Sequence, residues 1–305
     1  MANFTLAEVL KTQNDPLIRA IYRKFVTTTP FLANCVFRNT VGTSVDQNRR
    51  ATLPSQAFRT LNGTVTPTFS TTSRFNTPIA HAGTIFESDD FLKKVDAERI
   101  ADELDQQITA MTMNVNRVCF KGDKTANNEF DGLQVLTGAD GGANPERTGQ
   151  VIPNGATGLS LSILDEALIK TKGTGKAIYV SEDILIKMQR ASRDSSVAGN
   201  VNFTPETVGQ SIMQYSGVPI YWVGEDVDGT DILGYTEGAG TDETSIYVVA
   251  HDNGAIFDQV GGIDRKAIEG DFSSKVSTAW DMCLSIRDLR SVQRISGILD
   301  ASIVA

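Results

Sequence analysis

The sequence predicts an α+β fold, and three patterns carry this prediction. Apolar residues recur three or four positions apart between 95 and 118, which is the spacing of a helix. Residues 217–223 and 245–250 are apolar β-type runs separated by acidic, glycine-rich loops. Residues 275–287 alternate between apolar and polar side chains, which marks a half-buried strand. The chain contains no internal repeat.

Length and composition favour a globular protein with a modest core. A chain of 305 residues buries roughly three quarters of its unfolded surface, enough for one large domain or two ordinary ones. Apolar residues make up 40% and aromatic residues 7% of the chain. The 28 basic residues against 37 acidic ones give a net charge of −9, which argues against a nucleic-acid-binding surface.

Membrane segments and disulfides are not expected. No run of about 18 apolar residues occurs, and the N-terminus lacks a basic-then-apolar signal pattern. The three cysteines, Cys35, Cys119 and Cys283, are far apart and odd in number. This usage indicates small buried side chains in a reducing compartment.

Residues 1–40 are predicted to form a helical arm. Thr5 and Glu8 have the spacing of a capping box, and Asp15-Pro16 places a proline in the first turn of a second helix. An apolar stripe follows at Leu17, Ile18, Ile21 and Phe25. The stripe is too narrow for a core of its own, so the arm must pack on something else.

Residues 41–88 differ in composition, being rich in Thr, Ser, Asn, Gly and Pro. Asn62-Gly63 is a signal for a type I′ hairpin turn, but apolar residues are too sparse to stabilise a hairpin alone. We therefore expect an ordered extension that packs on a partner. Its arginines are either solvated or paired with a neighbour, and they are Arg49, Arg50, Arg59 and Arg74.

The strongest helix is predicted over residues 89–121. Ser88, Asp89 or Asp90 can cap it, acidic residues fill its front half, and Arg117 and Lys121 lie near its end, as the helix dipole favours. About thirty residues correspond to roughly 45 Å. We expect Gly122 to end the helix in a left-handed conformation.

Shorter elements are predicted after residue 160. Ser162 and Asp165 have capping-box spacing at the start of one helix. Residues 177–180 form a strand that leads into a helix capped by Ser181. Thr204 and Pro205 have the pattern of a helix start, which predicts a helix through residue 215.

The stretch 120–136 is dense in polar turn-forming residues but does not fit a calcium loop. From Asp123 the alternate positions are Thr125 and Asn127, Asn128 stands where glycine is needed, and Gly132 comes too late. We therefore interpret the stretch as a helix stop and turn. Its key residues are Gly122, Asp123, Phe130 and Gly132, with Leu133 returning to apolar packing.

Other chemical motifs fail on position. Residues 172–177 lack the first glycine of a phosphate loop and have Ala177 where Ser or Thr should hold magnesium. His81 and His251 are the only histidines, and no nucleophile elbow accompanies them. The acidic loops 224–231 and 236–244 could chelate cations weakly, but we expect them to be solvated. No catalytic, cofactor or metal residue is predicted.

Three segments resemble the major capsid protein of tailed bacteriophages, which has the Hong Kong 97-type fold. "RRATLPSQAFRTLNGTVTPTFSTT" (49–72) is similar to the family's hairpin. "VCFKGDKTANNEFDGLQVL" (118–136) resembles the family's exit from its long helix. "WDMCLSIRDLRSVQRISGI" (280–298) resembles its C-terminal ending. Their order and spacing extend the resemblance over nearly the whole chain.

The resemblance assigns a role to each part of the chain. It implies an N-terminal arm (1–40), an E-loop hairpin that lies over a neighbouring subunit (41–88), and a peripheral domain with the spine helix (89–132). It further implies an axial domain (133–250), a returning peripheral sheet (251–290) and a C-terminal axial segment (291–305). Arg49, Arg50, Phe58, Arg59 and Arg74 would then make inter-subunit contacts.

The implied function is that of a shell protein, not an enzyme. Hexamers and pentamers of the chain would build an icosahedral virion capsid in the bacterial host cytoplasm, enclosing double-stranded DNA without binding it specifically. Portal and decoration proteins would be partners. The chain begins at the arm, so a separate scaffolding protein is expected, or a chain already processed; Met1 favours the unprocessed state. The alternatives are an encapsulin-like compartment holding a cargo enzyme and, more distantly, a monomeric hydrolase or sugar-binding protein.

One departure from some relatives concerns covalent cross-links. Those relatives join an E-loop lysine to a neighbour's asparagine. No lysine occurs here between Lys24 and Lys93. The resemblance therefore implies a shell held together without covalent bonds.

Overall fold

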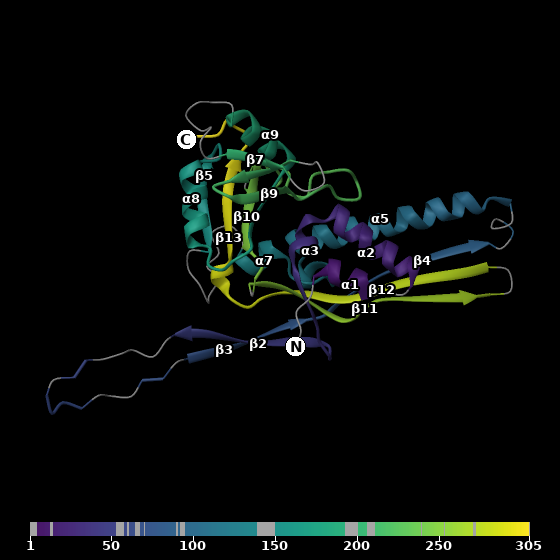
Figure 1. The fold of residues 1–305 in the computed structure, drawn as a ribbon, viewed down its shortest axis with the longest axis horizontal. Coiled ribbons are helices and arrows are strands. Elements are labelled where there is room, and N and C mark those ends of the chain that lie inside the picture. The colour runs from purple at the N-terminus through teal and green to yellow at the C-terminus, as the bar shows by residue number, and fades with distance from the viewer. Residues whose placement is uncertain are drawn as a thin grey trace.

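The computed structural model describes residues 5–12, 15–52, 58–59, 61–64, 68–69, 71–89, 91, 95–138, 150–192, 201–205, 211–238, 240–252, 254–270 and 273–304. Within these residues the fold is α+β, as predicted, with a four-stranded sheet, a seven-stranded sheet and a two-stranded hairpin. The hairpin projects from the base of the molecule, while the long helix and the four-stranded sheet extend in the other direction (Figure 1).

Three N-terminal helices form the arm: α1 (Leu6–Thr12), α2 (Pro16–Thr28) and α3 (Pro30–Asn34). Pro16 opens α2 as predicted, and the Thr5 amide donates to Glu8 Oε2 at 2.9 Å, one of the two capping-box bonds. Ile21 and Phe25 are fully buried. The arm therefore packs on the body of the chain.

The four-stranded sheet contains β1 (Val36–Asn39), β11 (Ala255–Glu269), β12 (Ser273–Ile286) and β4 (Ala80–Asp89), in that order. β1 is parallel to β11, and the other pairs are antiparallel. β12 confirms the strand predicted over 275–287. The long helix α5 (Ala97–Lys121) runs along this sheet beside β4 (Figure 1).

The seven-stranded sheet has the order β5, β13, β10, β6, β9, β8, β7. The strands are β5 (Val151–Thr157), β6 (Lys176–Val180), β7 (Val201–Pro205), β8 (Ser211–Tyr215), β9 (Val218–Trp222), β10 (Glu243–Ala250) and β13 (Val292–Leu299). The associated helices are α8 (Leu161–Lys170) and α9 (Glu182–Ala191). Short helices complete the fold: α6 (Lys124–Asn127), α7 (Leu133–Thr137) and η1 (Leu289–Ser291).

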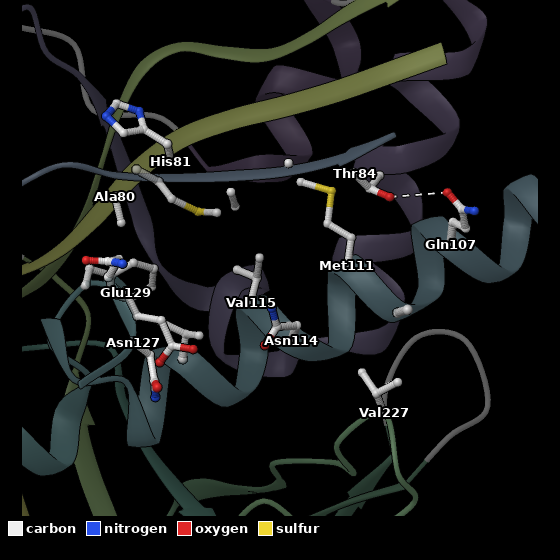
Figure 2. A pocket seen from close by; sticks show the side chains of 17 residues that line it. Ala80, His81, Thr84, Gln107, Met111, Asn114, Val115, Asn127, Glu129 and Val227 are labelled. Carbon is white, nitrogen blue, oxygen red and sulfur yellow. Dashed lines mark hydrogen bonds between the residues drawn. The ribbon is translucent and has the colours of Figure 1, made fainter. Parts of the chain in front are cut away.

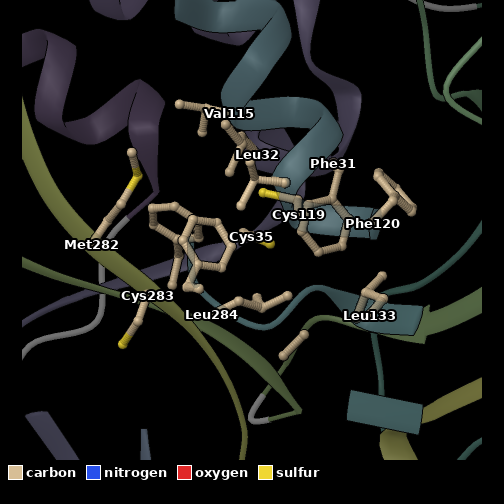
Figure 3. Close-up of a cluster of buried hydrophobic side chains, with 14 of the residues drawn as sticks. Phe31, Leu32, Cys35, Val115, Cys119, Phe120, Leu133, Met282, Cys283 and Leu284 are labelled. Atoms are coloured by element: carbon tan, nitrogen blue, oxygen red, sulfur yellow. The ribbon is translucent and has the colours of Figure 1, made fainter. Parts of the chain in front are cut away.

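The larger of two apolar cores joins the arm, α5 and the four-stranded sheet. Figure 3 shows the arm's Phe31, Leu32 and Cys35 meeting Cys119 and Phe120 of α5 and Leu284 of β12. Cys35, Cys119 and Cys283 are free and buried, as predicted, and burial raises the pKa of each thiol. The second core lies between the seven-stranded sheet and its helices.

The helix predicted from Thr204 to residue 215 is wrong. Residues 201–205 and 211–215 are the antiparallel strands β7 and β8. Met213 and Tyr215 are both buried while Gln214 between them is not, so the segment has the period of a strand. Pairing with the sheet edge outweighs the local helix-start signal. Residues 206–210 lie outside the described part.

Two predicted helix starts are displaced. α5 begins at Ala97, where the Asp96 side chain accepts from the Arg99 amide, whereas Ser88 and Asp89 are the last residues of β4; Asp90 lies outside the described residues. Strand pairing with β12 extends through Asp89, whose side chain accepts from the Phe91 amide at 2.7 Å. Phe91 and Val95 are helical, and the non-helical Asp96 separates them from α5. α8 begins at Leu161 with Ser160 as its N-cap residue, not at Ser162.

Candidate assembly surfaces

The hairpin of residues 44–78 is built from β2 (Ser44–Thr52) and β3 (Thr71–Pro78). Residues 53–70 connect the strands, so Asn62-Gly63 is not a two-residue turn between them. Asn62 has a φ of +64°, but Gly63 is not in the positive region, whereas a type I′ turn needs both. The predicted turn type is therefore wrong, although the predicted hairpin is present.

The root of the hairpin, residues 44–47 of β2 with 75–78 of β3, has one face against the rest of the chain. Val45 pairs with Thr77, so both lie on one face, and each is at most 5% exposed. On the opposite face Asp46 accepts from Arg74 and from Asn76 Nδ2, the latter at 2.7 Å. Hydrogen bonds from Arg74 and Asn76 lower the pKa of Asp46. The root is thus anchored within the chain.

Large apolar side chains lie exposed beyond the root, in the segment that connects the strands. Phe58, Leu61 and Phe69 have relative exposures of 105%, 95% and 84%. Arg59 is also exposed, and within the described residues its Nη1 donates to the carbonyl of Gly63 at 3.5 Å. Exposed aromatic and apolar groups gathered on one projection mark a surface that binds a partner.

The arginines predicted to contact a neighbouring subunit have different surroundings in the structure. Arg74 forms an ion pair with Asp46 of its own chain, whereas Arg59 is exposed on the connecting segment. Arg49 and Arg50 lie on β2 opposite Ser73 and Thr72, and their side chains are outside the described part. Contact with a neighbouring subunit stays a prediction for all of them and for Phe58.

Charge is distributed unevenly along the chain. In residues 41–88 four arginines oppose Asp46 and Glu87, a net +2, so the remaining 24 basic and 35 acidic residues carry a net −11. Four exposed acids lie on the first half of α5, and Asp105 among them pairs with Lys24 at 2.5 Å. The other three form what we call the acidic helix face: Glu98, Asp102 and Glu103. The hairpin and this face are complementary in charge.

Gly122 ends α5 as predicted, but not in a left-handed conformation. Its φ is −61° and its ψ 143°. A Cβ there would lie 2.4 Å from the Phe130 carbonyl oxygen and 2.6 Å from that of Val118. Gly132 is equally confined, since its Cβ would lie 2.5 Å from the Val118 oxygen. Close approach of backbone segments is therefore what requires glycine here.

Several side chains of the turn are bonded within it. Asp123 caps α6, accepting from the Thr125 amide at 2.8 Å and hydroxyl at 2.6 Å, and these bonds lower its pKa. Lys124 Nζ donates to Asp131 Oδ2 at 2.7 Å. Phe130 packs edge-on against Phe257. No group of three or more metal-ligating side chains occurs in the described part of the chain.

A groove of about 550 Å³ lies between β4, the middle of α5 and residues 127–130. Figure 2 shows His81 on β4 and Met111, Asn114 and Val115 on α5 around it, with Glu129 at one end. Met111 and Val115 are at most 8% exposed. Sequence reasoning missed this groove, because nothing local indicates which face of α5 stays open.

The two histidines have different surroundings. His81 is exposed, and its Nδ1 lies 2.7 Å from Asp281 Oδ1 on the paired strand. His251 is buried, with Nε2 2.7 Å from the Tyr179 hydroxyl, and burial lowers its pKa to about 4. His251 is therefore neutral at pH 7.

The prediction that the acidic loops are solvated is wrong for part of them. Glu237 is 7% exposed and pairs with the fully buried Arg294 at 2.7 Å. Asp231 accepts from the Glu182 amide at 2.8 Å, and burial raises its pKa. These carboxylates hold the loops against the seven-stranded sheet because buried charges need partners.

No described helix combines the length and the hydrophobicity needed to cross a membrane. No family model and no curated protein matches the sequence. The structure, in contrast, matches many solved structures with high probability.

Three of these structures illustrate the likeness. The cyanophage A-1(L) capsid asymmetric unit has a TM-score of 0.63 at 15% identity, covering 89% of this chain and 93% of that one. The capsid of the native GTA particle has a TM-score of 0.59 at 12% identity, covering 86% and 87%. The holo-SrpI encapsulin complex from Synechococcus elongatus PCC 7942 has a TM-score of 0.60 at 11% identity, covering 100% and 99%. The chain has the Hong Kong 97-type capsid fold, as the resemblance implied.

Proposed function

We propose that the chain is the major capsid protein of a tailed bacteriophage. Copies assemble as hexamers and pentamers into an icosahedral shell that encloses double-stranded DNA. The observation that carries this proposal is the projecting hairpin on a capsid fold: Phe58, Leu61 and Phe69 are almost fully exposed in the single chain. Exposed apolar side chains gathered on one projection mark a surface that a partner covers.

The charge distribution supports packing between copies. A hairpin region of net +2 belongs to a chain whose remainder has net −11. A hairpin laid on a neighbour's acidic helix face would bring opposite charges together, and this steers encounter and fixes register. A net negative container also avoids adsorbing the DNA that it encloses.

Each part of the chain receives a mechanical role in this proposal. The helices of residues 1–40 are the N-terminal arm, the hairpin is the E-loop, and α5 with the four-stranded sheet is the peripheral domain. The seven-stranded sheet is the axial domain, whose loops meet at the centres of hexamers and pentamers. Portal, scaffolding and decoration proteins are the proposed partners, and no catalytic activity is proposed.

An encapsulin-like compartment is the second candidate. The likeness to the encapsulin complex extends over 100% of this chain, so the fold alone does not separate the two functions. The difference lies in the contents, since a compartment of that kind would hold a cargo enzyme and a virion capsid would hold DNA.

Purified protein expressed in bacteria tests the proposal. Sedimentation velocity and electron micrographs should show spherical particles of uniform size. Particles with encapsidated, nuclease-protected DNA from infected cells support the capsid, whereas particles containing a single co-purified enzyme and no DNA support the compartment. A monodisperse monomer under all assembly conditions would exclude both.

A further inference from the structure

A cavity of about 230 Å³ lies at the root of the hairpin. Arg38 of β1 lines it, as do Gln47 and Asn48 of β2, Asp46 beside them and Arg287 just after β12. Arg38 and Arg287 belong to the four-stranded sheet and the residue that follows it, whereas the other residues belong to the hairpin. The cavity is thus where the projection joins the body.

Gln47 is the unusual residue in this cavity. Its side chain is 6% exposed, yet neither Nε2 nor Oε1 has a hydrogen-bond partner in the described chain. Gln47 pairs with Phe75 on the face of the hairpin that also carries the buried Val45 and Thr77. A buried amide without partners is destabilising, and native structures rarely keep one without a use.

Among the described residues around Gln47, the cation without an acidic partner is Arg287. The Arg38 Nε donates to Asp258, which also accepts from the Ser285 hydroxyl at 2.6 Å. Asp46 is paired with Arg74. Arg287 is exposed, its amide donates to the Gly254 carbonyl at 3.0 Å, and its guanidinium has no acidic partner among the described residues. Within the described part of the chain, the site therefore offers an amide donor and a guanidinium without an acidic partner.

We propose that this cavity receives a carboxylate side chain from a neighbouring copy of the chain. Gln47 Nε2 donates to one carboxylate oxygen and the Arg287 guanidinium to the other, a charge-assisted arrangement. The cavity has room for one side chain and its waters. The inference rests on the proposed function, because the donor is a second subunit.

A second copy is the favoured source because the chain is rich in exposed carboxylates. It has 37 acidic residues, and the acidic helix face presents three of them without a partner in the described structure. The hairpin root is also continuous with the projection that we propose to lie on a neighbour. A free carboxylate or phosphate ion is the other possible source of an anionic group.

The experiment separates the stability of the subunit from the stability of the assembly. Gln47→Leu removes the unpartnered amide at nearly constant volume, so the unassembled subunit should unfold at a higher urea concentration. The same variant should form particles that dissociate at a lower denaturant concentration than wild type. A more stable subunit together with less stable particles would indicate that Gln47 contributes to binding a partner and not to the fold of the subunit.

Two further variants test the inference even if Gln47→Leu fails to fold. Arg287→Gln should leave the urea midpoint of the subunit unchanged and weaken the particles, with a loss that shrinks at high salt. Gln47→Glu should weaken the particles too, because its carboxylate pairs with Arg287 and repels the incoming one. Arg290→Gln is the control, since Arg290 is nearby, exposed and paired with Asp288 in its own chain.

Each outcome decides one question. Particles of Gln47→Leu and Arg287→Gln that match the control overturn the inference and leave the proposed function intact. Acetate or phosphate that raises the melting temperature of the wild-type subunit but not of Arg287→Gln, with unchanged assembly, identifies a free anion and overturns the assignment to a neighbour. Failure of the wild type to form any particle, with a co-expressed scaffolding protein as well as without one, overturns the proposed function and the inference together.

Discussion

Replacing Gly122 by alanine should unfold the turn after α5, although the backbone angles of Gly122 suit any residue. Its φ of −61° and ψ of 143° are ordinary extended values. The obstacle is space: the new Cβ would meet the Phe130 and Val118 carbonyl oxygens at 2.4 and 2.6 Å. Both oxygens belong to backbone, so neither can rotate away.

The magnitude follows from what must move. Two hydrogen bonds pass through this residue, from the Gly122 amide to Val118 and from the Gly132 amide to the Gly122 carbonyl, each 2.9 Å long. Losing them costs about 1 kcal/mol each, and overpacking adds about 1–3 kcal/mol. We therefore expect a loss of about 3–5 kcal/mol in the free energy of unfolding, a large part of the usual 5–15 kcal/mol.

Urea denaturation of the unassembled subunit measures this loss. Gly155→Ala is the matched control: Gly155 has a φ of +77° but nothing within 4 Å of its Cβ position, so only conformational strain of about 1–2 kcal/mol applies. Gly122→Ala should be the more damaging change. An equal or smaller effect at Gly122 would refute the argument from close approach. A stoichiometric metal lost with the variant would show that the turn binds an ion after all.

Two further predictions concern assembly. Mature particles should run as single subunits in denaturing electrophoresis, because residues 25–92 contain no lysine to form an isopeptide bond; a ladder of covalent multimers would contradict this. Phe58→Ser should change subunit stability by less than about 0.5 kcal/mol, since Phe58 is fully exposed, but should raise the concentration needed for assembly at least about tenfold; light scattering at a series of concentrations measures this, and unchanged assembly would remove Phe58 from the contact surface.

Local sequence signals correctly predicted helices and strands where the apolar pattern is long or where no tertiary contact opposes it. Pro16 opens α2, residues 177–180 lie within β6, and β12 follows the alternation of 275–287. The α+β class and the order of arm, hairpin, long helix, α+β domain and returning strand followed from these patterns. Where a local signal met a competing sheet, the sheet prevailed: Thr204 and Pro205 resemble a helix start, yet they lie in β7 beside β8.

The sites that the sequence could not predict depend on contacts between distant segments. Arg38 and Asp258 are far apart in the chain and form a buried ion pair, and Glu237 with Arg294 forms another. The spacing of such residues carries no signal, because the fold alone brings them together. Likewise, Gly122 was correctly predicted to end the helix, but the expected reason was a left-handed backbone conformation. The structure shows that glycine is required because the Phe130 carbonyl oxygen leaves no room for a Cβ.

The pH dependence of stability should report on His251, which is buried against Tyr179 with no hydrogen-bond partner on Nδ1 in the described structure. Burial lowers its pKa from 6.5 to about 4. Between these two pKa values His251 is protonated in the unfolded chain but neutral in the folded chain. The free energy of unfolding therefore falls as the pH drops from about 6.5 towards 4.

A shift of this size corresponds to a loss of about 3 kcal/mol by pH 4. Carboxylates titrate in the lower part of the same range, so the comparison must be made with His251→Gln, whose neutral amide does not titrate. The wild type should lose about 3 kcal/mol more than this variant between pH 7 and pH 4 in urea melts of the unassembled subunit. Parallel losses in the two proteins would show that His251 does not resist protonation, and that the packing around Tyr179 opens to water.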